Sequence, residues 1–414
     1  MTASGGPRRV VVTGMGAVTP IGSTVADFWA GCRRAQVGVG ELGGFDVQDL
    51  KILIAAQIKD FDPKARLKHF RRDKIILHAD RYSWFAAAAS DEAVNMAGLQ
   101  VPFQDPYRVA CIIGSGGAGL VAVEAAYHDL FVKNKRATHP LTLLRIIGSS
   151  GAAHVGIEYG VKGPTFATCS ACSTAAHAIG VGRDYIRHGL VDTAIVGASE
   201  GVISYGTMRA WQAMHVLSPQ GIFPFAKKRN GTVLGEGAGI LVLESLEHAQ
   251  ARGAKILAEV AGFGMTSDSK DMVNPDIEGP KEAMRMALAD ANLGISDIDY
   301  LNAHGTATTI NDINETRAIK AVFGDHAKKL AISSTKSMHG HPLGAGGGIE
   351  AIACIKAMEE NWVPPTAGLD ETDPECDLDY VPNVGREKRV TYTMSNSFAF
   401  GGLNAVLVFG PPPA

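Results

Sequence analysis

Short apolar runs rich in β-branched residues alternate with helical stretches along the whole chain, and this alternation limits the possible folds more than any other feature. Strands that alternate with helices predict parallel or mixed sheets covered by helices on both faces, which is the α/β class. The expected strands are Arg9–Thr13, Val109–Ile113, Thr193–Val196, Ile240–Leu243, Lys255–Val260, Ile298–Asn302, Leu330–Ser333, Val390–Met394 and Ala405–Phe409. The expected helices are Asp80–Ala97, Val121–Lys133, Thr174–His188, Pro280–Asn292, Asn311–Phe323 and Ala345–Asn361.

The chain is long enough for two similar units. Its 414 residues exceed what one small core needs, and larger chains usually divide into several cores. Glu244–Arg252 has the pattern of a charged surface helix and linker between the units. The sequence by itself therefore predicts two α/β halves.

Composition excludes several classes of protein. A hydrophobic content of 46% and a charged content of 20% describe an ordinary globular protein. The net charge of −3 argues against a nucleic-acid-binding protein. Met1–Arg9 has no apolar segment of the kind that a secretory signal carries. No uninterrupted apolar run reaches the ~18 residues of a membrane span, so a cytoplasmic protein is expected.

The six cysteines are too few in so long a chain to form a disulfide framework. Cys169 and Cys172 form a C-x-x-C pair, which could indicate a redox or zinc site. A zinc site of this type needs a second such pair, and a redox site needs a thioredoxin-like context. The sequence contains neither a second C-x-x-C pair nor a thioredoxin-like context, so a zinc site and a redox site are both disfavoured.

Cys172 is the strongest candidate for a reactive residue. It follows the run Gly163–Ala171 and directly precedes the expected helix Thr174–His188. Unpaired N–H groups and the dipole at a helix start favour a thiolate, which is a strong nucleophile. The alternative is a buried structural thiol. Cys169 is taken as structural.

Two glycine-flanked histidines add to this signal. His304 follows the expected strand that ends at Asn302, and His341 lies in a glycine-rich turn. Active sites of α/β proteins gather at the carboxyl ends of strands. Either histidine alone would more often be structural, but the two together with an activated cysteine indicate thioester chemistry. His177 and His188 are expected to be structural, and His339, two residues before His341, could be confused with it.

The segment Gly114–Gly119 offers a rival interpretation. It matches G-x-G-x-x-G, follows a strand and precedes a helix, as in a dinucleotide-binding loop. However, it lies more than 100 residues into the chain, and no acidic residue ends a second strand ~20 residues later. A tight turn that lets backbone segments pack closely is preferred. An NAD-dependent dehydrogenase remains the alternative from another class.

These residues carry a family resemblance that runs from about Arg9 to Phe409. The chain resembles a β-ketoacyl-(acyl carrier protein) synthase, a condensing enzyme of the thiolase fold, and is most similar to the type II ketosynthases of fatty acid synthesis and related polyketide ketosynthases. The segments that carry the resemblance are the Cys172 run, Pro224-Phe225 with Gly235–Gly239, Asn302–Thr308, Ser334–Gly344 and Asn396–Gly402.

The resemblance implies a fold and a reaction. The fold is a pair of βαβαβαββ units stacked as five layers, with residues 9–250 carrying the nucleophile and residues 251–412 carrying both histidines. The reaction is a decarboxylative Claisen condensation, in which an acyl chain on Cys172 reacts with malonyl-acyl carrier protein. No metal, nicotinamide or flavin is required. The expected partners are acyl carrier protein and a second copy of the chain, in a homodimer.

The resemblance also implies roles for individual residues. His304 and His341 stabilise the enolate, and the backbone N–H groups of Cys172 and Phe400 form an oxyanion hole. Lys336 is a buried cation paired with Glu350. Further implied contacts to substrate come from Thr306, Thr308, Gly117 and Phe400, where Phe400 acts as a gate and the missing side chain of Gly117 lengthens the acyl pocket. A polyketide ketosynthase and a thiolase are the alternatives within this fold. A thiolase would use two cysteines, whereas a non-catalytic chain-length partner would lack Cys172.

A basic segment is the candidate surface for the acidic carrier protein. Lys64–Lys74 concentrates positive charge in a chain of net charge −3, and Arg71 and Lys74 are chosen as its docking residues. Charge pairing of this kind speeds encounter and weakens with salt. The alternative is a solvated helix face.

Overall fold

The computed structural model describes residues 6–413, and its centre is a ten-stranded mixed sheet. Residues 1–5, which form part of the segment inspected for a secretory signal, lie outside the described residues. The strands of the sheet are β1 (Val10–Val18), β4 (Val109–Gly114), β5 (Thr165–Phe166), β6 (Thr193–Glu200), β7 (Gly237–Ser245), β8 (Ala258–Ser267), β9 (Ile298–Asn302), β10 (Ala331–Ser333), β13 (Tyr392–Ala399) and β14 (Leu403–Gly410).

The two halves of the sheet have the same topology. Counted along the chain, the strands of each half lie in the order 3-2-4-5-1, which is β5-β4-β6-β7-β1 in the first half and β10-β9-β13-β14-β8 in the second. Parallel and antiparallel pairings also agree between the halves. Only two residue pairs of β1 and β8 join them. The two α/β halves that the sequence predicted, and the duplication that the resemblance implied, are therefore confirmed.

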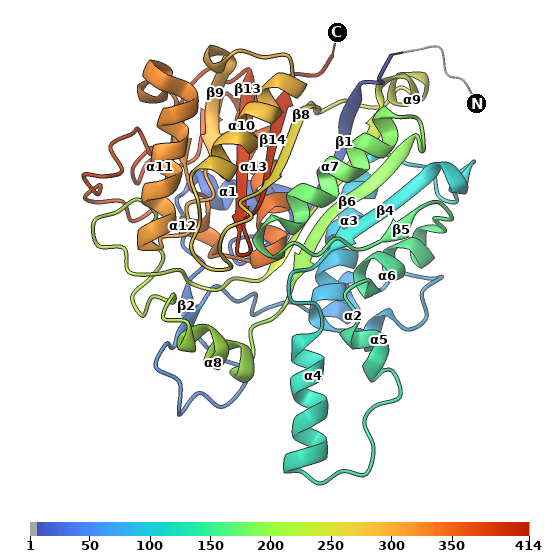
Figure 1. Ribbon diagram of the computed structural model, residues 1–414. Coiled ribbons are helices and arrows are strands. Elements are labelled where there is room, and N and C mark those ends of the chain that lie inside the picture. The colour runs from blue at the N-terminus through green and yellow to red at the C-terminus, as the bar shows by residue number, and fades with distance from the viewer. Residues whose placement is uncertain (1–5, 414) are drawn as a thin grey trace.

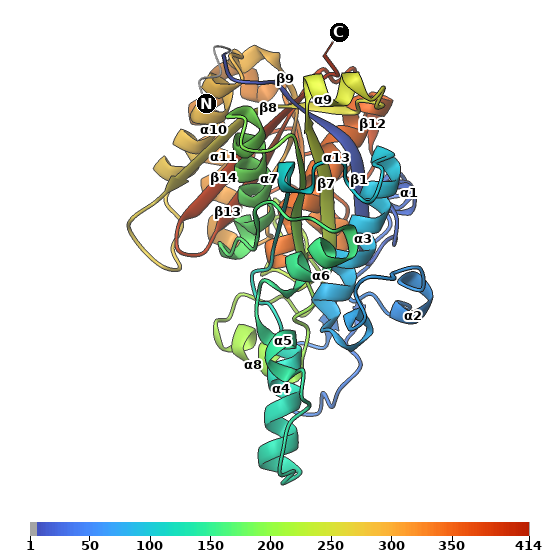
Figure 2. The ribbon, with the colours of Figure 1, turned by 90° about the vertical axis from the view of Figure 1, so that its right-hand side faces the viewer.

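Helices form the remaining layers of the thiolase-like fold (Figures 1 and 2). Between the halves, α7 (Thr174–Arg187) packs on β6 and α13 (Gly346–Glu360) packs on β7 and β13, and the two helices contact each other. On the outer faces, α3 (Arg81–Ala97) covers β1 and β7, and α10 (Glu278–Asp290) covers β8 and β14. The other helices are α1 (Val25–Arg33), α2 (Pro63–Arg66), α4 (Leu120–Tyr127), α5 (Thr142–Ile146), α6 (Ser150–Tyr159), α8 (Tyr205–Ala213), α9 (Leu246–Ala251), α11 (Thr309–Phe323) and α12 (Lys336–His339).

Two small antiparallel pairs lie outside the main sheet: β2 (Gly40–Glu41) with β3 (Ile54–Ala55), and β11 (Trp362–Val363) with β12 (Arg386–Glu387). Within residues 6–413, no helix has both the length and the apolar character needed to cross a bilayer. The expected linker is α9 with its flanks, which connects β7 to β8. The division into residues 9–250 and 251–412 falls within α9, and we keep it as a proposal.

The expected helices and strands are present, but several strands are longer than expected. β1 continues through Gly14 and Gly16 to Val18. A Cβ atom on Gly14 would lie 2.0 Å from the carbonyl oxygen of Ala93, and one on Gly16 would lie 1.8 Å from that of Ala89. These glycines let α3 approach the sheet at a distance that no side chain would allow. Glycine has a low strand propensity, so the sequence pattern predicted a shorter strand than the structure contains.

Candidate active site

Cys172 lies in a short 3-10 turn, Ala171–Ser173, that leads directly into α7. Ala171 has a φ of +46°, in the left-handed region that non-glycine residues rarely adopt. The hydroxyl of Thr174 holds this turn, because it accepts from the N–H of Ser170 at 2.9 Å and donates to the carbonyl of Ala171 at 2.7 Å. The turn thereby presents the side chain of Cys172, a residue that is 7% exposed, at the start of α7.

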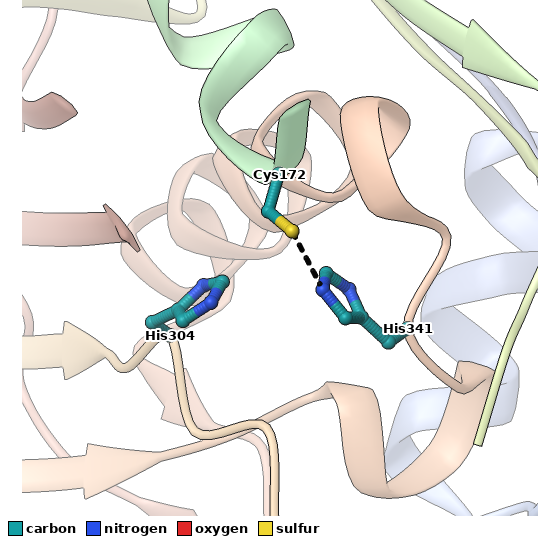
Figure 3. A group of neighbouring side chains, drawn as sticks. All are labelled: Cys172, His304 and His341. Atoms are coloured by element: carbon teal, nitrogen blue, oxygen red, sulfur yellow. Dashed lines mark hydrogen bonds between the residues drawn. The ribbon is translucent and has the colours of Figure 1, made fainter. Parts of the chain in front are cut away.

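The two candidate histidines come from the second half of the chain and meet Cys172 (Figure 3). His304 follows β9, and His341 follows α12. His341 Nε2 lies 3.1 Å from the Sγ of Cys172, and the His304 and His341 rings lie edge to face with centroids 5.5 Å apart. One thiol and two imidazoles, all buried, therefore share one small space.

Backbone contacts hold each histidine in place. The carboxylate of Glu315, on α11, accepts from the N–H groups of His304 and Gly305, both at 2.8 Å. The His341 N–H donates to the carbonyl of Val233 at 2.8 Å. The pattern of α11 gave no sign of the role of Glu315, because a glutamate in an amphipathic helix is usually a surface residue.

Lys336 lies buried beside His304. Its ammonium contacts the carboxylate of Glu350, which makes the expected ion pair, and its Nζ lies 3.5 Å from His304 Nδ1. An ammonium group has no acceptor, so His304 Nδ1 must carry the lone pair and Nε2 the hydrogen. Burial, followed by the charge of Lys336, holds the pKa of both His304 and His341 well below the usual range. Both imidazoles are therefore neutral at physiological pH.

The resting state of Cys172 differs from the sequence-based expectation. Burial raises the pKa of its thiol to about 12, although the charge of Lys336 and the N–H of Phe400 act in the opposite direction. Burial therefore acts against the thiolate that the helix start was expected to favour. The thiol must lose its proton as it attacks, and His341 Nε2 is close enough to accept it.

A cavity of about 250 Å³ reaches this cluster from the surface. Thr306 and Thr308 line it, and their hydroxyls are hydrogen-bonded to each other at 3.0 Å. Phe400 also lines it and lies against Trp211 of α8, with ring centroids 5.9 Å apart. Trp211 carries no motif, so sequence reasoning missed it.

Gly117 does not line this cavity. A Cβ atom on Gly117 would lie 2.4 Å from Cγ1 of Val202, which is fully buried. The expectation that Gly117 opens the acyl pocket gains no support from these contacts, because the side chain of Val202 occupies the space next to it. The alternative, a glycine that permits close packing, agrees with the contacts.

The dinucleotide interpretation of Gly114–Gly119 is wrong. The N–H groups of Gly116 and Gly117, which would bind a pyrophosphate, donate instead to the carboxylate of Glu200 at 2.9 and 3.0 Å. A Cβ atom on Gly119 would lie 2.1 Å from the carbonyl oxygen of Arg145. The loop is thus packed against protein on both sides.

The other sequence candidates lie apart from the reacting groups. All six cysteines are free, and Cys169 is exposed, with its sulfur 3.9 Å from the carbonyl oxygen of Gly116. Three histidines are engaged in local hydrogen bonds: His177 with Ser170 and Ser173, His188 with Asp184, and His339 with Thr335. Arg71 and Lys74 are exposed, on a segment whose backbone N–H groups at residues 71–73 donate to Glu158.

The potential ligand atoms of Cys172, His304 and His341 all lie within 4.8 Å of one another, a spacing that suits a metal ion. A thiolate and two imidazoles could serve as three zinc ligands. Two features oppose a metal ion here. The ammonium of Lys336 next to His304 would repel a second cation. The raised pKa of Cys172 disfavours the thiolate that a metal ion needs as a ligand. The cluster is better suited to acyl transfer through the sulfur.

Comparison with known proteins gives a consistent result. A family model for the N-terminal domain of β-ketoacyl synthases matches residues 7–249, and one for the C-terminal domain matches residues 257–370. Nodulation protein E of Rhizobium sp. (strain N33) is 44% identical over 402 residues, which cover 97% of this chain and 99% of that protein. The 3-oxoacyl-[acyl-carrier-protein] synthase 2 of Staphylococcus aureus (strain COL) is 41% identical over 411 residues, covering 97% of this chain and 98% of that protein.

Solved structures agree with the fold. The ishigamide ketosynthase/chain length factor superposes with a TM-score of 0.93 at 34% identity, covering 98% of this chain and 100% of that one. A ketosynthase in complex with its type II polyketide synthase acyl-carrier protein superposes with a TM-score of 0.89 at 31% identity, with the same coverage.

Proposed function

The chain belongs to the β-ketoacyl synthase family, and on that premise we propose that it catalyses a decarboxylative condensation between an acyl chain held on Cys172 and malonyl-acyl carrier protein. The observation that carries the proposal is the convergence of one thiol and two neutral imidazoles in a buried cluster that a cavity connects to the surface. A condensing acyltransferase needs these groups together.

In the first half-reaction, the Sγ of Cys172 attacks the acyl thioester while its proton passes to His341 Nε2. The tetrahedral oxyanion accepts hydrogen bonds from the backbone N–H groups of Cys172 and Phe400. The carbon–sulfur bond to the carrier then breaks, and the carrier thiolate takes the proton from His341. The products are acyl-Cys172 and the free carrier thiol.

In the second half-reaction, the bond between the malonyl carboxylate and Cα breaks, and CO₂ leaves. The electron pair forms an enolate, whose oxygen accepts hydrogen bonds from His304 and His341. The enolate carbon attacks the acyl carbonyl, and the bond to Cys172 breaks to give a β-ketoacyl carrier thioester. The Cys172 thiolate takes up a proton from water.

Two chain-elongation pathways fit this chemistry. We propose elongation in fatty acid synthesis, including long or very long chains, because the family includes 3-oxoacyl-[acyl-carrier-protein] synthase 2 at 41% identity. A polyketide ketosynthase is the second candidate, because a type II polyketide ketosynthase has the same fold with a TM-score of 0.89. A thiolase needs a second cysteine, and Cys169 is exposed rather than part of the buried cluster.

The test is mass spectrometry of the protein after exposure to a mixed pool of acyl-carrier proteins. We expect one acyl group on Cys172, and its mass identifies the preferred chain. Cys172→Ala should lose the adduct, whereas Cys169→Ala, a matched loss of the neighbouring thiol, should keep it. A covalent acyl-enzyme in Cys172→Ala would overturn the assignment.

A further inference from the structure

A buried carboxylate that the mechanism does not use lies next to the active site. Glu200 ends β6 with no exposed surface. It accepts from the N–H groups of Gly116, Gly117 and Gly344 at 2.9, 3.0 and 3.0 Å, and from the hydroxyl of Ser115 at 2.9 Å. Burial raises the pKa of this carboxyl group, whereas the four hydrogen-bond donors around it act in the opposite direction and favour the ionised form.

The two loops that Glu200 joins lie close to the reacting residues. Gly344 follows His341 by three residues, and a Cβ atom on Gly344 would lie 2.6 Å from the backbone nitrogen of Gly116. A Cβ atom on Gly116 would in turn lie 3.3 Å from the carbonyl oxygen of Ala171, the residue before Cys172. One carboxylate thus ties the backbone beside the nucleophile to the backbone beside the histidine.

The charge of Glu200 is balanced by these donors alone. None of the ion pairs among residues 6–413 includes Glu200. The hydroxyl of Ser115 accepts from the N–H of Ala118 at 2.8 Å, so its hydrogen is free to donate to the carboxylate. After burial, the nearby charge of Glu200 contributes to the raised pKa of Cys172, and Lys336 opposes it.

We propose that Glu200 is a positioning residue with two effects on the reaction. Its hydrogen bonds hold the His341 loop at contact distance from Cys172, and its negative charge, next to the turn that carries Cys172, adds to the effect of burial in disfavouring a thiolate before an acyl substrate arrives. A protonated thiol resists alkylation and oxidation between turnovers. The first effect concerns the condensation and so rests on the proposed function, whereas the second does not.

Glu200→Gln tests both effects at once, because it removes the charge and replaces one hydrogen-bond acceptor with an NH₂ donor. Loss of a nearby negative charge should lower the pKa of Cys172 by roughly one unit. At pH 8, a pKa lower by one unit gives about ten times more Cys172 thiolate, but this thiolate is about threefold less nucleophilic. Alkylation of Cys172 by iodoacetamide should therefore become about threefold faster. The glutamine NH₂ group cannot accept a hydrogen bond from the backbone N–H groups that face it, so it should displace the loop that carries His341. The kcat of the condensation should therefore fall at least about tenfold. KM for the carrier substrates should change little.

Two further variants decide between a specific and a merely structural role. Glu200→Asp keeps the charge but shortens the side chain, so we expect wild-type alkylation and a reduced kcat. Glu92→Gln is the matched control, because Glu92 accepts from the N–H groups of Ala17 and Val25 at 2.9 and 2.8 Å, away from the reacting groups. It should lower thermal stability without changing either readout.

Each result bears on the proposal. Unchanged or slower alkylation in Glu200→Gln, full kcat in Glu200→Asp, or the same changes in Glu92→Gln would overturn it. If Glu200→Gln fails to fold, the kcat and alkylation of Glu200→Asp decide. If wild-type protein alkylates as expected but condenses no substrate, the proposed function fails while the charge effect of Glu200 can still be measured.

Discussion

The two histidines of the cluster differ in what fixes their protons. The ammonium of Lys336 faces His304 Nδ1, so His304 can only donate from Nε2. Nδ1 of His341 has no hydrogen-bond partner among residues 6–413, so its tautomer is not fixed in this way. His341 Nε2 can accept the proton of Cys172 in the first half-reaction and donate to the enolate in the second. The structure thus suggests one permanent donor and one adaptable group.

This difference gives a prediction for His304→Ala and His341→Ala. Loss of one donor to a developing oxyanion costs about 10²–10³-fold in rate, so both variants should release CO₂ from malonyl-carrier protein that much more slowly. Only His341→Ala should also slow acyl transfer to Cys172, because only His341 contacts the sulfur. Single-turnover labelling and CO₂ release measure the two steps separately. Equal slowing of acylation in both variants would contradict the division of roles.

The buried pair of Lys336 and Glu350 gives a second prediction at this scale. Both side chains are at most 1% exposed. Removing one partner of such a pair typically destabilises a protein by about 3–5 kcal/mol, whereas replacing both with apolar residues is often neutral. Lys336→Met should therefore lower the free energy of unfolding, and the double variant with Glu350→Met should recover much of it. Both the single and the double variant should release CO₂ slowly, because His304 loses the contact with Lys336 that fixes its tautomer. Denaturant titration with the CO₂ assay tests both statements, and recovered release in the double variant would contradict this role for Lys336.

At the scale of elements, the helices expected from the sequence are present, whereas α1, α6 and α8 were not predicted. The motifs identified Cys172, His304 and His341, and the structure brings these three together. Sequence patterns could not predict contacts between residues that lie far apart in the chain and carry no motif. The contacts of Glu315 and Glu200 with the loops they hold are of this kind. Nor could the motif around Cys172 predict the burial that raises the pKa of its thiol.

The contact between Gly117 and Val202 changes the result that we expect from substituting Gly117. Because a Cβ atom would lie 2.4 Å from Val202 Cγ1, Gly117→Ile should overpack the core and lower stability by about 1–3 kcal/mol, with loss of activity on short and long acyl chains alike. Gly148→Ala is the control, because a Cβ atom there would lie at an ordinary 3.5 Å from the Cβ of Ala118. Thermal melting and assays with two chain lengths measure the effects. Selective loss of long chains, with unchanged melting, would restore the open-pocket interpretation.

At the scale of the whole molecule, one arm stands out from the body. The segment that includes α4 and α5 projects away from the sheet in both views (Figures 1 and 2). It exposes a set of large apolar side chains, which are Leu120, Tyr127, Phe131, Val132, Leu143, Leu144 and Ile147. Apolar groups gathered in this way usually mark an interface. We propose that a second copy of the chain covers the arm in a homodimer.

The arm gives a prediction about assembly. Phe131 and Leu143 are each 75% exposed in the single chain, so Phe131→Glu with Leu143→Glu should place charges in the proposed interface and shift the protein from dimer to monomer. Val384→Glu is the control, because Val384 is equally exposed, at 76%, but lies near β12. Light scattering after size-exclusion chromatography measures the mass. A wild-type monomer, or a dimer that survives the double variant, would contradict the proposal.

The second surface feature is the basic segment Lys64–Lys74, proposed to bind an acidic acyl carrier protein. Its backbone is held against α6, because the carboxylate of Glu158 accepts from the N–H groups of residues 71–73 at 2.9 Å each. Arg71 and Lys74 therefore lie on a fixed support with their side chains exposed. A rigid patch of charge suits an encounter that depends on electrostatic attraction.

Arg71→Glu with Lys74→Glu should raise the apparent KM for acyl-carrier protein about tenfold at low ionic strength, and the difference should shrink as salt screens the charges. Reaction with small thioester analogues should stay near the wild-type rate, because these substrates do not touch the segment. Lys328→Glu with Lys329→Glu is the matched control: it makes the same change in net charge at two exposed lysines beside β10, away from the segment. Steady-state kinetics at two salt concentrations distinguish the outcomes. An equal loss with carrier-bound and small substrates would indicate damage to the fold, and an equal effect of the control pair would indicate a response to net charge rather than to this patch.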